Sequence, residues 1–473
     1  MSSHYDAIII GSGQSGTPLA SAFAAAGHKT AIVERSHIGG TCVNEGCTPT
    51  KTMIASGRAA YAATRGNMYG ITGTETFAVN MERVRLRKRT IVSDWSRGGT
   101  SRLVEAGVDV VRGEARFVGR RELWVETGQG DERTLTAERI FINTGERPAR
   151  PDIHGLADVA AERILDSTSI MELGDVPRHL LVVGGGYVGL EFGQLFRRLG
   201  ADVTIVQRAT QLIPREDDDV ADVMLNILRE DGVTVYLSSS IESVSPQDSG
   251  VLVTLTNEAN GTIEFEASHV LLAAGRTPNT DMLDLAAAGV ETTSRGYVVV
   301  DESLKTKVPG VYAIGDVHGG PAFTHISYDD FRVIRTNLLP DFSPSQSLKL
   351  TTTKASPSRS LTPYVVYTDP QLGHVGLHAK DVAHRETKTA RMPMSHVARA
   401  IETGETRGLM KATVDATTGE ILGFTCLGIE GGEVMAIVQT AMVGGLKWWD
   451  LETAVWAHPS LAESLNNLWG YLQ

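Results

Sequence analysis

The sequence predicts an α/β protein built on two Rossmann-like dinucleotide-binding domains, followed by a strand-rich C-terminal region. Three observations support this prediction. A glycine-rich turn joins an apolar strand pattern to a helical pattern at Gly11, and the same arrangement returns at Gly184. Residues 362–375 and 408–427 then alternate between apolar and polar side chains, which is typical of strands in a sheet.

Size, charge and cysteine content narrow the class of protein. The 473 residues allow about three to four domains. A net charge of −12 and the lack of a long basic run argue against nucleic acid or an anionic membrane as a partner. The N-terminus does not resemble a signal peptide, and no apolar run is long enough to span a membrane. We therefore expect a cytoplasmic protein whose three cysteines are not a secreted disulfide scaffold.

The first glycine motif has the context that a dinucleotide site requires. Gly11, Gly13 and Gly16 form a G-x-G-x-x-G turn between a strand and a helix, and the next strand ends at Glu34. The glycines let the backbone approach a pyrophosphate, and the helix N-terminus offers amide donors. The Glu34 carboxylate can accept a hydrogen bond from a ribose hydroxyl.

The second motif repeats the first at a constant offset. Gly184 and Gly189 stand 173 positions after Gly11 and Gly16, and the position of Glu34 is then occupied by Gln207. Two such units indicate that one chain binds two dinucleotides.

The end of the second unit bears on the choice of nicotinamide cofactor. An acid at this position would repel the 2′-phosphate of NADP, whereas Gln207 is neutral and Arg208 follows it. The pattern favours NADPH, with NADH still possible.

Two cysteines lie between the glycine motifs, at Cys42 and Cys47. Thr48 and Pro49 are typical of the N-cap and first residue of a helix, whose positive end would lower a nearby thiol pKa. Five steps of straight helix rise about 7.5 Å, too far for a disulfide once lateral offset is added, so a bridge requires irregular winding near Gly46.

Two other interpretations of the cysteine pair are open. A structural zinc site needs about four ligands, and the third cysteine, Cys426, is distant in sequence. We therefore expect no metal site here. Two inert core cysteines are the remaining alternative.

Five segments carry a resemblance to a known family: residues 39–51, 142–145, 274–279, 313–316 and 458–463. On these motifs the chain resembles, over almost its whole length, the class I flavin-dependent pyridine nucleotide–disulfide oxidoreductases. This family includes glutathione reductase, dihydrolipoyl dehydrogenase and mercuric reductase. The segment 39–51, which holds both cysteines, is the most specific of the matches.

The resemblance implies a domain order and an assembly. An FAD domain would comprise residues 1–149 and 276–345, with an NAD(P) domain inserted at 150–275. A dimerisation domain of α+β type would comprise residues 346–473. The stretch 340–360, rich in Ser, Thr and Pro, is the predicted linker before that domain. The family forms homodimers in which both chains build each active site.

The resemblance also implies catalytic roles. Cys47 would be the thiolate that faces the flavin, and Cys42 the thiol that exchanges with substrate. His458 of the partner subunit, held by Glu463, would act as the acid–base. Lys51 would lie near the flavin, paired with Glu191 on the helix of the second unit.

Cofactor contacts follow from the motifs and the resemblance together. Asp316 would bind the ribitol of FAD, and Tyr187 would cover the nicotinamide pocket. The whole predicted cofactor-binding set is Gly11, Gly13, Gly16, Glu34, Gly40, Thr41, Lys51, Ala115, Thr144, Gly145, Asp316, Gly184, Gly186, Tyr187, Gly189, Gln207, Arg208 and Gly275.

The predicted function is an FAD-dependent NAD(P)H oxidoreductase. Hydride would pass from the nicotinamide through FAD to a Cys42–Cys47 disulfide, which would reduce a small disulfide, oxidised-sulfur or reactive-species substrate. Three segments, 48–53, 323–335 and 458–468, resemble flavoproteins of reactive-chlorine and hypothiocyanous-acid resistance and mercuric-reductase-like bacterial proteins. The alternatives are a reductase of mercury(II) or copper(II), a dihydrolipoyl dehydrogenase, and a flavoprotein electron carrier without thiol turnover.

Overall fold

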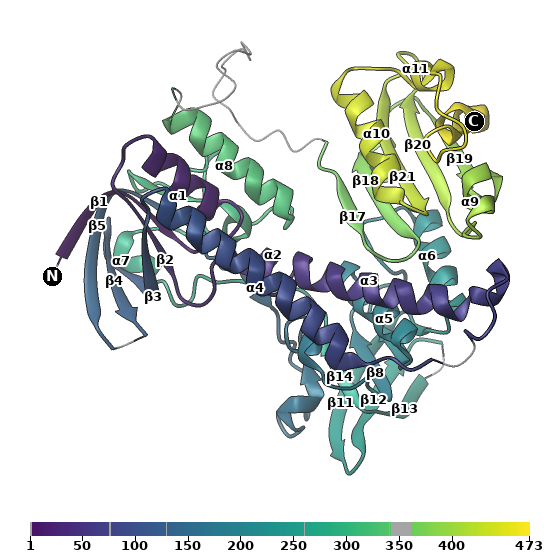
Figure 1. Cartoon of the computed structure of the whole chain (residues 1–473), viewed down its shortest axis with the longest axis horizontal. Coiled ribbons are helices and arrows are strands. Elements are labelled where there is room, and N and C mark those ends of the chain that lie inside the picture. Colours follow the sequence, from purple (N-terminus) through teal and green to yellow (C-terminus); the bar gives the residue numbers. More distant parts are fainter. Residues whose placement is uncertain (1, 75–76, 129, 260, 340, 342–360) are drawn as a thin grey trace. The chain divides into compact units, whose positions relative to one another are not determined.

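The computed structural model describes residues 2–74, 77–128, 130–259, 261–339, 341 and 361–473 (Figure 1). The chain divides into two compact units, each drawn from three segments. The first unit comprises Met1–Thr52, Leu86–Ala149 and Gly275–Ser358. The second unit comprises Met53–Arg85, Arg150–Ala274 and Arg359–Gln473. Apart from residue 341, the predicted linker at 340–360 lies outside the described residues.

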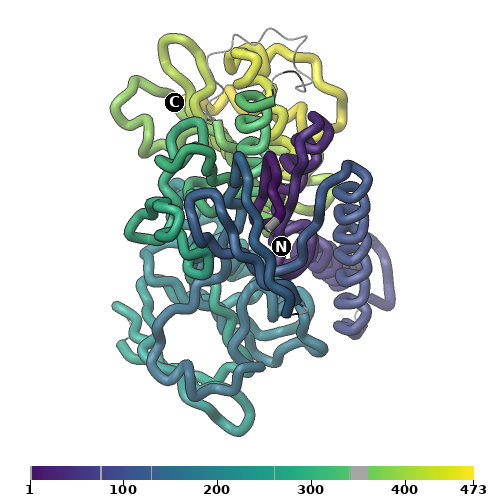
Figure 2. The backbone as a smooth tube through the Cα atoms, turned by 90° about the vertical axis from the view of Figure 1, so that its left-hand side faces the viewer, coloured from purple at the N-terminus to yellow at the C-terminus, as the bar shows by residue number. Residues whose placement is uncertain are grey.

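A mainly parallel sheet forms the centre of the first unit. Strand β1 lies between β2 and β5, and β2 and β5 continue outward to β3 and β16. Strand β4 pairs antiparallel with both β3 and β5. Figures 1 and 2 show β1, in purple, beside the blue β5 along its length. The bounds are β1 Ser2–Ile10, β2 Thr30–Glu34, β3 Asp109–Gly119, β4 Glu122–Thr127, β5 Glu132–Ile142 and β16 Val311–Ala313.

The apolar sequence of β1 explains why this sheet is buried on both faces. Ala7 and Ile9 face one cluster, which includes Phe23 of helix α1 (Gly16–Ala25), whereas Ile8 and Ile10 face a second cluster on the other side. Successive side chains of a strand point to opposite faces, and a run that is apolar throughout is typical of a parallel strand covered on both sides.

Further elements lie wholly or partly in the first unit. Helix α8 packs near α1, and β6 pairs antiparallel with β15. Among the described residues, no helix is both long enough and apolar enough to cross a bilayer. The bounds are α2 Gly40–Asn44, α3 Cys47–Thr64, α4 Met81–Glu105, β6 Glu146–Pro148, β15 Arg276–Pro278, α7 Leu285–Ala288 and α8 Thr324–Leu338.

The second unit contains a five-stranded parallel sheet in the order β10–β9–β8–β14–β7. An antiparallel sheet of β11, β12 and β13 accompanies it and shares its apolar core. The bounds are β7 Ile164–Leu165, β8 His179–Val183, α5 Tyr187–Leu199, β9 Asp202–Val206, α6 Asp218–Glu230, β10 Thr234–Tyr236, β11 Ser239–Gln247, β12 Gly250–Asn257, β13 Gly261–Ala267 and β14 His269–Leu272.

The C-terminal part of the second unit is an antiparallel sheet in the order β17–β18–β21–β20–β19, with α10 packed on β18 and β21. The alternating segments of the sequence therefore form strands, as predicted. The bounds are β17 Tyr364–Val366, β18 Gln371–Gly376, β19 Thr387–Pro393, α9 Ala398–Glu402, β20 Leu409–Asp415, β21 Ile421–Gly428, α10 Gly431–Val443, α11 Trp448–Thr453 and α12 Ser464–Leu468.

The two glycine motifs adopt the same backbone in their separate units. Gly11 and Gly184 have φ values of +99° and +113°, which favour glycine. A Cβ atom on Gly16 would lie 2.4 Å from the Gly11 carbonyl oxygen, and one on Gly189 would lie 2.1 Å from that of Gly184. The two motifs are therefore alike in backbone structure as well as in sequence. In both, the third glycine lets the helix pass close to the end of the strand.

Candidate functional site

The chain breaks its helical path between the two cysteines of the first unit. Helix α2 ends at Asn44, Glu45 leaves the helical region with a φ of −136°, and α3 begins at Cys47. The Cys42 and Cys47 side chains are thereby brought into hydrogen-bond contact. A Cβ on Gly46 would lie 2.9 Å from the Thr41 carbonyl oxygen, so the tight turn favours glycine. The irregular winding predicted near Gly46 is confirmed.

The start of α3 differs from the prediction. The helix begins at Cys47 rather than after an N-cap at Thr48, because the Thr50 N–H donates to the Gly46 carbonyl at 3.0 Å. Pro49 is tolerated within this first turn, where backbone N–H groups have no partner in the helix. Cys47 itself therefore occupies the positive end of α3.

A second helix also begins at the sulfur atoms. Thr324 is the first residue of α8, and its hydroxyl lies 3.3 Å from Cys47 Sγ. The N-termini of α3 and α8 thus meet at this pair, and both favour a negative charge there. Thr324 was not among the site residues predicted from the sequence, although it lies in the segment 323–335 that carries part of the resemblance.

The two sulfur atoms influence each other's charge. The pKa of Cys42 is raised by its hydrogen bond to Cys47 and by burial, and the Thr324 hydroxyl and the Lys51 charge oppose this rise. Two adjacent thiolates would repel each other, so the pair favours one thiol and one thiolate. A negative charge is therefore disfavoured at Cys42, next to a Cys47 that lies at the positive end of α3.

Glu34 closes the first glycine loop. Its Oε2 accepts hydrogen bonds from the Ser12 N–H at 3.0 Å and the Ser12 hydroxyl at 2.6 Å. Its Oε1 accepts from the Ser36 N–H at 2.8 Å and the Ser36 hydroxyl at 3.3 Å. The carboxylate is therefore fixed at the carboxyl end of β2, where an adenosine ribose is expected.

Asn143 joins the end of β5 to the glycine loop. Its side-chain amide donates to the Gly11 carbonyl at 2.9 Å and accepts from the Ser15 hydroxyl at 2.9 Å. A Cβ on Gly16 would lie 2.3 Å from Asn143 Nδ2. Asn143 was not among the predicted site residues, although it directly precedes the predicted Thr144.

Four more residues of the predicted cofactor site lie in turns or at the ends of elements of the first unit, and a fifth, Ala115, lies in its core. A Cβ on Gly40 would lie 2.6 Å from the Gly13 Cα, so these two turns touch. The Thr144 hydroxyl donates to the Asn279 carbonyl at 2.8 Å, and Gly145 follows with a φ of +62°. Thr41 is exposed on α2, whereas Ala115 of β3 is buried in the apolar core.

Asp316 provides an acidic group in a largely buried place. Burial raises its pKa, the nearby Glu146 carboxylate raises it further, and the Ser327 hydroxyl donates to its Oδ1 at 3.0 Å. A buried carboxylate gains from additional hydrogen-bond donors. The glycine cradle and this carboxylate together fit the pyrophosphate and polyol hydroxyls of FAD.

The second glycine loop repeats the first in its hydrogen bonding. The Gly185 N–H donates to Gln207 Oε1 at 3.2 Å, as the Ser12 N–H does to Glu34 at the equivalent place. Gln207 Nε2 donates to the Gln211 carbonyl at 3.3 Å, and Arg208 is exposed beside it. This loop therefore lacks the buried negative charge of the first. Gly275, with a φ of +124°, falls at the start of a segment of the first unit.

Tyr187 begins α5 directly after the second glycine loop. Its hydroxyl donates to Glu216 Oε1 at 3.1 Å, and its ring stacks on Tyr364 with the centroids 5.5 Å apart. Glu216 and Tyr364 were not predicted from the sequence, because they come from distant segments and match no short motif.

His458 and Glu463 meet across a turn, as the sequence analysis expected. His458 Nδ1 lies 2.8 Å from Glu463 Oε2, and the side chain of His458 is 75% exposed. A carboxylate only accepts hydrogen bonds, so Nδ1 carries the proton and Nε2 is left as the basic nitrogen.

The predicted pairing of Lys51 with Glu191 stays a prediction. Lys51 belongs to the first unit and Glu191 to the second. Within the second unit, Glu191 accepts the Tyr367 N–H at 2.8 Å.

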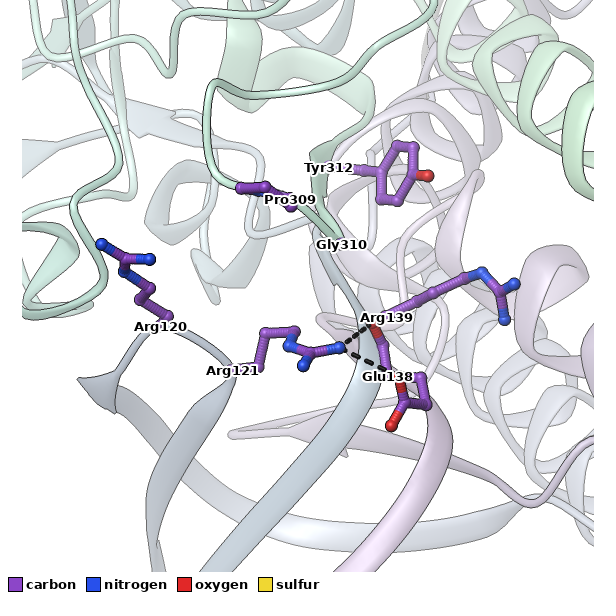
Figure 3. Close-up of a pocket in the computed structure, with 7 residues that line it drawn as sticks. All are labelled: Arg120, Arg121, Glu138, Arg139, Pro309, Gly310 and Tyr312. Carbon is purple, nitrogen blue, oxygen red and sulfur yellow. Dashed lines mark hydrogen bonds and ion pairs between the residues drawn. The ribbon is translucent and has the colours of Figure 1, made fainter.

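A separate open pocket of about 450 Å³ lies in the first unit, at the amino end of β16 (Figure 3). The glycine loop follows the carboxyl end of β1, so this pocket is not the dinucleotide site. Figure 3 shows the guanidinium groups of Arg120 and Arg139 pointing away from each other, which does not suit the binding of one anion. Its lining is Arg120, Arg121, Glu138, Arg139, Pro309, Gly310 and Tyr312.

Two family models match the chain. The model of the pyridine nucleotide-disulphide oxidoreductases matches residues 5–330, and the model of their dimerisation domain matches residues 362–468. The matched dimerisation domain fits a homodimer.

Several known proteins are similar to the chain over nearly its whole length. The probable pyridine nucleotide-disulfide oxidoreductase RclA of Escherichia coli (strain K12) is 33% identical over 99% of each chain. A mercuric reductase of Streptomyces lividans is 35% identical over 98% of this chain and 94% of its own. A dihydrolipoyl dehydrogenase of Geobacillus stearothermophilus is 31% identical over 97% and 94%.

The solved structures give the same result. A Cu(II) complex of the HOCl-induced flavoprotein disulfide reductase RclA from Escherichia coli matches with a TM-score of 0.88 and 33% identity, over 99% of each chain. This likeness confirms the predicted fold class.

We expect the substitution Thr324→Val to raise the pKa of the dithiol pair by about one unit, because it removes a hydroxyl that stabilises the charged sulfur. The ultraviolet absorbance of the thiolate, followed against pH in the reduced protein, measures this shift. Thr324→Ser keeps the hydroxyl and is the matched control. Identical titrations of the Val and Ser variants would show that the Thr324 hydroxyl does not stabilise a charged sulfur.

Proposed function

The chain belongs to the pyridine nucleotide–disulfide oxidoreductases, and from this premise we propose that it is a flavoprotein disulfide reductase that works through Cys42 and Cys47. When bound, FAD supplies the hydride acceptor and the two-electron donor that such chemistry requires. The cradle at Gly11 and the acidic groups of Glu34 and Asp316 are the residues proposed to hold it.

The observation that supports this proposal is the contact between the two sulfur atoms at the N-termini of α3 and α8. A disulfide that takes up two electrons and one proton becomes one thiol and one thiolate. The structure favours that product, because the Cys42 pKa is raised while Cys47 lies at two helix N-termini. Cys42 is then the thiol proposed to exchange with substrate, and Cys47 the thiolate proposed to face the flavin.

The acid–base is proposed to come from the other chain of a homodimer. Nε2 of the histidine would take the proton from Cys42 as its sulfur attacks, and would return it to the leaving sulfur. In each chain, Glu463 holds the tautomer that leaves Nε2 basic. His458 of the partner subunit is therefore the proposed catalytic group.

We expect Cys42→Ser to abolish disulfide turnover and to lower the electron uptake of the holoenzyme by one pair, because no dithiol can then form. An anaerobic reductive titration of the flavin spectrum measures this uptake. Cys426→Ala is the matched control, because Cys426 is fully buried and its pKa is raised to about 12. Full turnover of the Ser variant with every acceptor would sink the proposal and favour an electron carrier.

NADPH is the proposed electron donor. The second glycine loop is closed by neutral Gln207, and Arg208 is exposed beside it. A 2′-phosphate at this strand end would meet one positive charge and no carboxylate from these two positions. Tyr187, directly after this loop, is the proposed cover of the nicotinamide ring.

We expect Arg208→Ala to lower kcat/KM for NADPH by about tenfold and to leave NADH almost unchanged, because one charge-assisted contact is lost. Steady-state kinetics with both nucleotides measure the ratio. Arg229→Ala, at an exposed position near the end of α6, is the control. An equal loss with both nucleotides would show that Arg208 does not read the phosphate.

The proposed substrate class is a small disulfide, an oxidised-sulfur compound or a reactive species. Among the similar proteins, RclA is described as HOCl-induced and as a flavoprotein disulfide reductase. The retained pair of His458 and Glu463 supports thiol exchange in this chain, because that chemistry needs a proton carrier.

Reduction of copper(II) or mercury(II) is the second candidate. Two adjacent soft sulfur ligands suit such ions, and the similar proteins include a mercuric reductase and an RclA structure solved as a Cu(II) complex.

We expect His458→Ala to lower disulfide reduction by about a hundredfold while metal-dependent NADPH oxidation is kept, because metal reduction needs no proton shuttle at sulfur. Parallel assays with a disulfide and with copper(II) make this comparison. Equal losses in the two assays would contradict the distinction, and activity with copper(II) alone would favour the second candidate.

A further inference from the structure

Glu216 is a buried carboxylate that the proposed function leaves unused. Its side chain is 2% exposed, and its Oε1 accepts hydrogen bonds from Tyr187 at 3.1 Å and from Tyr364 at 2.5 Å. Among the described residues, its Oε2 has no hydrogen-bond partner. The rings of Tyr187 and Tyr364 stack at an interplanar angle of 26°. Tyr187 is therefore held both at its hydroxyl and along its ring.

The buried position of Glu216 disfavours its negative charge. Burial raises the pKa of Glu216 to about 7, although both phenol hydroxyls oppose the rise. A glutamine would fill the same space without a buried charge. A residue that keeps a destabilising charge next to a proposed cofactor site is a candidate for a functional role.

Burial also disfavours the charged forms of the two histidines near Glu216. Burial lowers the pKa of His374 to about 3 and also lowers the pKa of His378. Asp217 is paired with Lys411 at 2.7 Å. The titratable or charged groups around Glu216 are Tyr187 of α5, Tyr364 of β17, His374 of β18, His378, Lys380, Lys411 of β20, and the neighbouring Arg215 and Asp217.

The cluster does not have the geometry of a cation site, although atoms of Glu216, His374 and His378 lie within 4.8 Å of one another. The two imidazole rings stack with centroids 3.9 Å apart and an interplanar angle of 7°. An ion in the plane of one ring would therefore lie outside the plane of the other. His374 also has both nitrogens in contact, with Thr425 and with the Gly376 carbonyl. The contacts describe a hydrogen-bonded network instead.

We propose that Glu216, together with Tyr364, is a positioning residue that anchors Tyr187 and so fixes one wall of the nicotinamide site. The ionised carboxylate is the stronger acceptor for the two hydroxyls, so the anchor holds best when Glu216 is charged. This inference rests on the proposed role of Tyr187. A wall that is already ordered reduces the entropy lost when the nucleotide binds.

The test separates the nucleotide step from the sulfur step in the holoenzyme. Flavin reduction by NADPH is followed anaerobically by stopped flow, and reoxidation of the reduced protein by a small disulfide is followed separately. We expect Glu216→Gln and Tyr364→Phe to weaken NADPH binding in the first step by about tenfold, the effect of one charge-assisted hydrogen bond. The second step should not change.

The pH profile provides a readout that a purely structural role would not move. In the native protein we expect NADPH binding to weaken as the pH falls through about 7, where Glu216 gains its proton. The Glu216→Gln variant should lose this dependence. Glu230→Gln, the same substitution at an exposed position of α6, should keep it.

Thermal unfolding checks that the variants fold. A carboxyl whose pKa is raised by folding destabilises the protein progressively as pH rises from about 4.5 to about 7, so Glu216→Gln should raise Tm above that range and leave it unchanged near pH 4. Glu230→Gln should leave Tm unchanged at each pH.

Two results would overturn the inference. One is a Glu216→Gln variant with native affinity for NADPH and a native pH profile. The other is an equal loss in the nucleotide and disulfide steps, which would indicate general damage. If NAD(P)H failed to reduce the flavin of the native holoenzyme, that result would instead contradict the proposed function itself.

Discussion

The contact between two sulfur atoms five residues apart is the constraint on which the chemistry of the first unit depends. A continuous helix would hold Cys42 and Cys47 too far apart, so α2 must end and α3 must begin between them. Gly46 permits this break, because its missing side chain lets the turn pass close to the Thr41 carbonyl. The same break places Cys47 at the start of α3, so one local feature provides both the contact and the positive potential.

The repeated glycine loops show which parts of a site a sequence can predict. The constant offset between the two motifs carries through to equivalent φ values, equivalent close approaches and equivalent loop-closing hydrogen bonds at Glu34 and Gln207. These features are local, because a strand, a turn and the first residues of a helix determine them. The break between the two cysteines was predictable for the same reason, whereas the first residue of α3 was predicted two residues too late, at Pro49 instead of Cys47.

Residues that reach a site from distant segments could not be predicted in this way. Thr324 contacts Cys47 across 277 positions, and Tyr364 contacts Glu216 across 148. Neither contact can be recognised from a motif or spacing in the sequence. A hydroxyl at a helix end or on a strand can make many kinds of hydrogen bond, so its presence does not indicate a site. His458 and Glu463 were found from the resemblance, and their hydrogen bond is on an exposed surface where an isolated ion pair adds little stability. Its proposed value lies in fixing the histidine tautomer for the acid–base role proposed above.

Two buried glutamates, Glu34 in the first unit and Glu216 in the second, differ in how fully their carboxylates are hydrogen-bonded. Glu34 is 7% exposed, and its two oxygens accept four hydrogen bonds from Ser12 and Ser36, so its charge is well compensated. Glu216 is more deeply buried, yet only its Oε1 has hydrogen-bond donors among the described residues. The hydrogen bonds of Glu34 hold the first glycine loop to the end of β2. Glu216, with hydrogen-bond donors at one oxygen only in the described part of the chain, can gain or lose its proton near pH 7. The positions of Tyr187 and Tyr364, whose hydroxyls bind this carboxylate, are then coupled to that proton.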